Sequence, residues 1–144
     1  MDILNFGWEE WVALPDLGLP AIKAKIDTGA RTSALHAHNI EVFGPVNKPK
    51  VRFNVYPVAG KDTVDITCSA TIVDRREVTS SNGEAERRYV IQTALLVAGQ
   101  SWPIEITLTD RSSMSARMLL GRQALQDHIT ITASEKRLQP DLNY

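Results

Sequence analysis

The sequence predicts an all-β protein with a single domain, and three observations lead to this class. Short runs of alternating apolar and polar residues follow one another, separated by turn-forming residues about every 8–12 positions. Only one short segment near the C-terminus has a helical pattern. The 144 residues, 43% of them hydrophobic, suffice for one sizeable core. We therefore expect a closed or partly open β-barrel, or a β-sandwich, with one short helix.

The first part of the chain predicts a β-hairpin that ends at an acidic corner. Loosely alternating residues 8–14 and the strand 22–26 flank a turn at 15–20 that holds two prolines and a glycine. In the second strand the lysines alternate with apolar residues and so share one face. Asp27 follows where this strand ends, and Gly29 permits backbone angles closed to other residues. Such a corner either turns the chain or presents a reactive carboxylate.

The middle of the chain predicts further strands. Alternation over 33–43 slips by one near Asn39, which indicates a bulge or break. Residues 51–57 and 64–73 predict a second hairpin. The polar segment 75–91 has an Asn-Gly turn at its centre, and we expect an exposed hairpin there because its arms carry little apolar surface.

The last part of the chain completes the set of strands. The apolar triplet before Gly121 indicates a strand buried on both faces. The expected elements are, in order, strands at 92–97 and 102–109, the buried strand 118–120, one or two helical turns at 122–127, a strand at 128–132, and a tail at 138–144.

Charge and composition exclude several classes of function. Sixteen Lys and Arg residues against seventeen Asp and Glu residues provide no basic field, so we expect no binding to nucleic acid. No apolar run approaches the roughly 20 residues that span a bilayer, and the N-terminus has no basic, apolar leader pattern. We expect a cytoplasmic protein without membrane contact. The single cysteine, Cys68, excludes an internal disulfide, and we interpret it as a buried apolar residue.

Two distant motifs together resemble the retropepsin-like aspartic peptidases. Asp27–Ala30 reads Asp-Thr-Gly-Ala after an apolar strand, and Met118–Arg122 reads Met-Leu-Leu-Gly-Arg before the short helix. That family has these motifs in this order, with a flap hairpin between them. The resemblance implies a retropepsin-like barrel over residues 1–144, a flap candidate at about 77–88, and an added hairpin at about 39–73.

A longer match is similar to a bacterial family labelled ATP-dependent zinc protease, whose members often accompany ATP-grasp glutamate ligases. It includes Lys25–Ala37, Leu108–Arg111 and Met118–Arg122. The label does not fit the residues, because the sequence has neither a His-Glu-x-x-His zinc motif nor a phosphate-binding Gly-x-x-x-x-Gly-Lys-Ser/Thr loop. We therefore interpret the chain as an aspartic peptidase that needs no cofactor.

The resemblance implies a role for each motif residue. Asp27 is the expected catalytic carboxylate, and Thr28 and Gly29 shape its corner. Structural support is expected from Gly121 and Arg122. The expected substrate-binding residues are Ala30, Arg31, Ser80, Ser81, Asn82 and Gly83.

One position departs from the family pattern. Retroviral enzymes have an acidic residue after the alanine that pairs with the arginine of the Gly-Arg motif, whereas this chain has Arg31, which would repel Arg122. Arg122 therefore needs another partner. If Arg31 faces the substrate, an acidic or glutamate-rich peptide is favoured.

The chemistry requires two carboxylates that share one proton, with one acting as the base on water and the other polarising the peptide carbonyl. The chain holds one Asp-Thr-Gly motif, so the hypothesis requires a homodimer in which Asp27 is contributed twice.

Two alternatives remain open at this point. The same fold without a competent pair of aspartates would be a non-catalytic peptide-binding module. His36 and His38 lie at alternate strand positions, and with a further ligand they would suit a zinc hydrolase.

Overall fold

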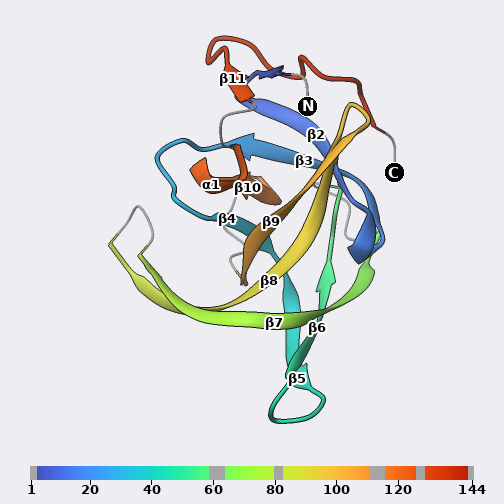
Figure 1. Cartoon of the computed structure of the whole chain (residues 1–144), viewed down its shortest axis with the longest axis vertical. Coiled ribbons are helices and arrows are strands. Elements are labelled where there is room, and N and C mark those ends of the chain that lie inside the picture. Colours follow the sequence, from blue (N-terminus) through green and yellow to red (C-terminus); the bar gives the residue numbers. More distant parts are fainter. Residues whose placement is uncertain (1–2, 59–63, 80–82, 111–115, 126–128, 143–144) are drawn as a thin grey trace.

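The computed structural model describes residues 3–58, 64–79, 83–110, 116–125 and 129–142. It confirms the all-β class, because strands dominate and the described residues form only one short α-helix and one 3₁₀ turn (Figure 1). No helix in these ranges has the length and apolar character needed to cross a membrane. The elements are β1 Leu4–Phe6, β2 Glu9–Leu14, η1 Pro15–Leu17, β3 Leu19–Ile26, β4 Ser33–His36, β5 His38–Phe43, β6 Lys50–Val55, β7 Ile66–Thr79, β8 Ala85–Val97, β9 Gln100–Thr109, β10 Met118–Leu120, α1 Arg122–Leu125 and β11 Ile129–Ile131.

Nine strands form one curved sheet in the order β2, β3, β10, β4, β9, β8, β7, β6, β5. A further pairing of Ala13 with Leu96 joins β2 to β8, so the sheet returns to its own first strand. This curvature gives the apolar faces one common interior. The largest side chains that are fully buried there include Phe6, Leu14, Leu19, Ile22, Leu35, Phe53, Ile91, Leu95, Ile106, Met118 and Leu120.

The exposed hairpin expected over 75–91 is present as the outer part of a longer one, because β7 and β8 pair from Ile72–Ile91 out to Thr79–Ala85. β7 continues through Thr79 and β8 begins at Ala85, and both are long, strongly bent strands (Figure 1). Arg88 on β8 is only 6% exposed. β8 pairs with β9 as well as with β7, and this pairing buries Arg88, which local hydrophilicity would place in water.

The break expected near Asn39 is present. Asn39 has a φ of 53°, and the β5–β6 register shifts between His38 and Glu41. Val42, a core candidate from its alternation, is instead 39% exposed. β5 is the last strand of the sheet, and the turn that joins it to β6 projects beyond β7, so this end of β5 lies outside the core (Figure 1).

The two ends of the chain are joined near the top of Figure 1, where β1 pairs in parallel with β11. The carboxylate of Glu10, which is fully buried, accepts backbone hydrogen bonds from Gly7 (2.7 Å), Leu138 (2.8 Å) and Gln139 (2.9 Å). The C-terminal tail expected from Leu138 onward is thus tethered at its start.

Candidate active site

The Asp27 corner continues the ladder of β3. The amide of Asp27 donates to the carbonyl of Leu120 at 2.9 Å, and Ala30 donates back to the carbonyl of Asp27 at 3.2 Å. The carboxylate oxygen Oδ1 accepts a hydrogen bond from the amide of Gly29 at 3.1 Å. Asp27 is half-buried, whereas Thr28 and Gly29 are exposed. A small turn therefore holds this carboxylate at the surface in a defined orientation.

The Gly-Arg motif supports this corner from the far end of the sequence. The amide of Arg122 donates to the carbonyl of Ala30 at 2.8 Å, and that of Gln123 donates to the carbonyl of Arg31 at 3.1 Å. The Arg122 guanidinium donates through Nη1 to the carbonyl of Thr28 at 2.9 Å. Arg122 thus has a backbone carbonyl where the family pattern has an acidic side chain. The side chain of Arg31 is exposed.

Gly121 lies where a larger residue has no room. A Cβ built on it would come within 2.6 Å of the Thr32 backbone and 2.9 Å of the Ala30 carbonyl oxygen. Its amide donates to Oγ of Ser33 at 3.1 Å. The glycine therefore permits β10 and the corner to approach each other closely.

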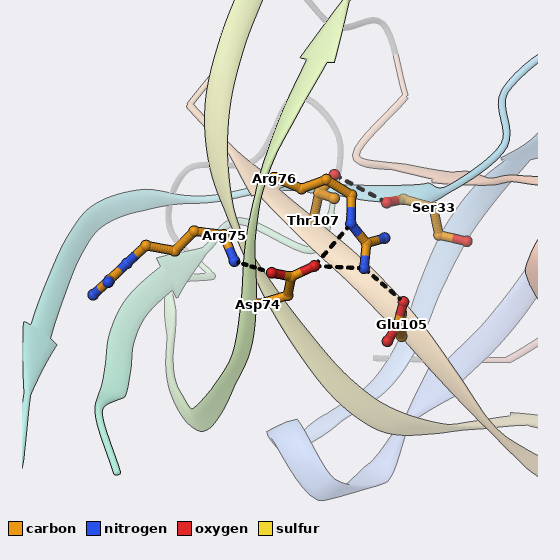
Figure 2. Close-up of polar contacts among 6 residues, drawn as sticks. All are labelled: Ser33, Asp74, Arg75, Arg76, Glu105 and Thr107. Carbon is orange, nitrogen blue, oxygen red and sulfur yellow. Dashed lines mark hydrogen bonds and ion pairs between the residues drawn. The ribbon is translucent and has the colours of Figure 1, made fainter. Parts of the chain in front are cut away.

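A buried polar chain joins the corner to the long strands. Oγ1 of Thr107 on β9 donates to the carbonyl of Ser33 at 3.0 Å, and Nη1 of Arg88 donates to Oγ1 of Thr107 at 3.4 Å (Figure 2 shows the Thr107–Ser33 contact). Sequence reasoning placed Ser33 in the Asp27 motif but did not identify Thr107 as its partner, because 74 residues separate the two.

A second polar cluster lies on β7. Arg76 donates to Oδ2 of Asp74 at 2.9 Å and to Oε1 of Glu105 at 3.2 Å (Figure 2). The hydrogen bond from Arg76 lowers the pKa of the exposed Asp74 carboxyl, and the amide of Arg75 adds to this effect. This cluster fixes β7 against β9 and is separate from the hydrogen bonds of the Asp27 corner.

The β7–β8 hairpin supplies the flap candidate. Its last described pair is Thr79 with Ala85. Ser80, Ser81 and Asn82 lie outside the described residues, and Gly83 is exposed with a φ of 86°. Among the described residues no hydrogen bond joins Gly83 to Asp27, so substrate binding by this hairpin stays a prediction.

The two histidines have separate surroundings. His36 is 5% exposed at the end of β4, and burial is the main cause that lowers its pKa. His38 stacks on the ring of Tyr56 at 4.2 Å, and its Nε2 lies 3.6 Å from Oδ1 of Asp65. Within the described ranges, no three His, Cys, Asp or Glu residues form a group that could hold a metal ion.

The single cysteine, Cys68, is buried as expected, and its burial raises the pKa of the thiol to about 12.

The all-β sheet, the Asp-Thr-Gly corner and its Gly-Arg support define a protein of the retropepsin-like class. The chain belongs to the RimB-like family, whose model, described as retropepsin-like aspartic endopeptidase RimB, matches residues 5–141.

The curated relatives of this chain are named as ligases, whereas the family model is described as an endopeptidase. The chain is 47% identical over 129 residues to a probable alpha-L-glutamate ligase of Shewanella pealeana, and 42% identical over 125 residues to one of Desulfotalea psychrophila. These matches cover 90% and 87% of this chain but only 28% and 27% of the relatives. The chain thus spans a little over a quarter of their length.

One solved structure is similar over nearly the whole chain. It is the crystal structure of a Legionella pneumophila protein of unknown function, with a TM-score of 0.78 and 26% sequence identity. The match covers 94% of this chain and 97% of that one.

Proposed function

We propose that this protein is an aspartic endopeptidase that hydrolyses acidic or glutamate-rich peptides, with Asp27 as its catalytic carboxylate. The observation that carries the proposal is the Asp27 corner, because a half-buried carboxylate is held in a fixed turn by Gly29 and by the backbone of Leu120. The family description, a retropepsin-like aspartic endopeptidase, supports this reading. The return of β8 to β2 suits a closed barrel of the acid-protease type.

The reaction needs one ionised and one protonated Asp27. The ionised carboxylate accepts a proton from water while the water oxygen bonds to the peptide carbonyl carbon. The protonated carboxylate donates a hydrogen bond to the carbonyl oxygen. Collapse of the tetrahedral species breaks the C–N bond, and the leaving amine takes a proton from the pair. Two carboxylates at this distance cannot both ionise, so their apparent pKa values belong to the pair.

A homodimer supplies the second carboxylate. Each chain has a single Asp-Thr-Gly motif, and Thr28 and Gly29 are exposed beside Asp27. This leaves the corner open to a second copy related by a two-fold axis. In that arrangement the Thr28 hydroxyls are available to join the two corners, and the β7–β8 hairpin closes over the peptide.

The acidic substrate is supported by the chain's own charges and by its relatives. Arg31 is exposed and follows the corner directly. The curated relatives are named for glutamate ligation, and their matched quarter corresponds to this chain. A hydrolase for glutamate chains would perform the reverse chemistry of such a ligase.

The test is hydrolysis of an oligoglutamate peptide that carries a fluorophore and a quencher. Asp27→Asn should lower turnover by about 10²–10⁴-fold without changing the thermal midpoint, while the exposed Asp16→Asn should leave both unchanged. In mixtures of wild-type and Asp27→Asn chains, activity should follow the square of the wild-type fraction.

Three results would overturn the proposal in different ways. Unchanged turnover in Asp27→Asn would remove the catalytic assignment. A linear dependence on the wild-type fraction would remove the shared site. Binding of peptide by the wild type without any cleavage would make the chain a peptide-binding module.

A further inference from the structure

A groove on the outer face of the β2–β3 hairpin lies outside the residues assigned above. It has a volume of about 380 Å³, within the range of small ligand sites. The side chains of Trp8 and Trp11 supply aromatic surface, and Lys23, Lys25 and Arg117 supply cations. Aromatic faces beside cations suit a ligand that has both apolar methylene groups and negative charge.

The cations of this groove form no ion pair among the described residues, and Lys23 instead lies over the ring of Trp11 at 5.2 Å. Across the described part of the chain, no carboxylate oxygen lies within 4 Å of a charged nitrogen of Lys23, Lys25 or Arg117. The one acidic lining residue, Glu9, is already paired through Oε1 with Arg137 at 2.9 Å. The groove is therefore positively charged and open to an external anion.

The groove and the catalytic candidate share one face of β3. Ala24 and Ile26 are buried, while Lys23 and Lys25 are exposed. The amide of Asp27 still bonds to Leu120, so the strand alternation extends through Asp27. Its side chain thus leaves the backbone on the same face as the two lysines. At about 3.3 Å per residue, Lys25 and Lys23 lie about 7 and 13 Å from Asp27 along the strand.

The exposure pattern of the neighbouring strand β10 supports the placement of Lys25 and Asp27 on one outer face. The triplet 118–120 is buried at Met118 and Leu120 but only half-buried at Leu119, in contrast to the expectation of burial on both faces. Leu119 pairs with Lys25, and so belongs to the outer face. Arg117 immediately precedes this strand and lines the groove. Residues far apart in the sequence thereby build one continuous surface next to the corner.

We infer that this groove is the specificity subsite for acidic side chains on one side of the cleaved bond, and that Lys25 and Lys23 are the residues that select them. An extended peptide advances at nearly the same rise as β3, so the selected carboxylates lie about two and four residues from the cleaved bond. The indoles of Trp8 and Trp11 pack against their methylene groups. The inference rests on the proposed function, whose site it extends.

Binding is tested first, in the Asp27→Asn chain, so that cleavage does not interfere. Titration with hexaglutamate should change tryptophan fluorescence, whereas hexaglutamine should not. Lys25→Gln and Lys23→Gln should each weaken binding about threefold to fivefold, and both together about tenfold. The exposed Lys48→Gln is the matched control and should have no effect. Added salt should weaken hexaglutamate binding less in the double variant than in the parent.

Turnover is tested second, in the chain with Asp27 intact. Lys25→Gln should raise KM for the oligoglutamate substrate with little change in kcat, and glutamine substitution of the peptide two and four residues from the cleaved bond should reproduce this loss. Cleavage that does not respond to Lys23 or Lys25 would overturn the subsite and leave the peptidase standing. Lysine-dependent binding without cleavage by the wild type would overturn the peptidase and leave the groove as an acidic-peptide site.

Discussion

The guanidinium of Arg122 donates a hydrogen bond to the carbonyl of Thr28 across 2.9 Å, although 94 residues separate them. This contact joins α1 to the residue after Asp27. Together with the bonds from the amides of Arg122 and Gln123 to the corner backbone, it makes α1 a brace for the carboxylate. An acidic partner for Arg122 is unnecessary, because a backbone carbonyl accepts from the cation instead.

Removal of this contact should impair catalysis more than stability. Arg122→Ala should lower the free energy of unfolding by about 1–2 kcal/mol. It should reduce kcat by about tenfold to a hundredfold, since the corner loses its alignment. Arg122→Lys should restore part of kcat. Gln123→Ala, which keeps its backbone bond, is the control. Equal losses of kcat in both alanine variants would contradict a specific role for the guanidinium.

Glu10 should be among the polar residues on which stability depends most strongly. Its buried carboxylate accepts three backbone hydrogen bonds, and Glu10→Gln would replace one acceptor oxygen by a donor that faces these amides. We expect a loss of about 2–4 kcal/mol in denaturant unfolding. Glu9→Gln, which breaks a partly exposed ion pair with Arg137, should cost about 0–1 kcal/mol. Similar midpoints for the two variants would contradict the inferred tether of the C-terminal segment.

His36 should make stability depend on pH. Burial and the nearby Arg117 lower its pKa in the folded state, against the partly opposing effects of Asp110 and the Thr109 backbone. Below a pH of about 6.5, the unfolded chain therefore binds a proton that the folded chain excludes. Stability should fall as pH decreases through 6.5, by at most about 1.4 kcal/mol per unit.

The measurement is the denaturant midpoint at pH 7.5 and pH 5.5. The wild type should lose more stability between these values than His36→Gln, whatever the absolute stability of the variant. An identical loss in both proteins would show that His36 does not carry this dependence.

The all-β fold class and the turn at Asp27 were predictable from the sequence because both depend on local residue patterns. Alternation marked most strands, and the motif at Asp27 marked the candidate site. The strand β1 was not predicted, because its three residues carry too short a pattern and pair with β11 from the other end of the chain. The exposed hairpin over 75–91 was predicted, but its continuation into the long strands β7 and β8 and the burial of Arg88 were not, because the polar pattern of the segment indicates neither.

By itself, the sequence determined that strands alternate with turns and that a carboxylate follows the strand at 22–26, since side-chain periodicity and turn propensity act over a few residues. Only the tertiary structure decided that Thr107 braces Ser33, that Glu10 holds the C-terminal segment, and that Arg117 lies in a groove with Lys25. The physical reason is that these contacts join residues brought together by sheet pairing, for which no local pattern exists.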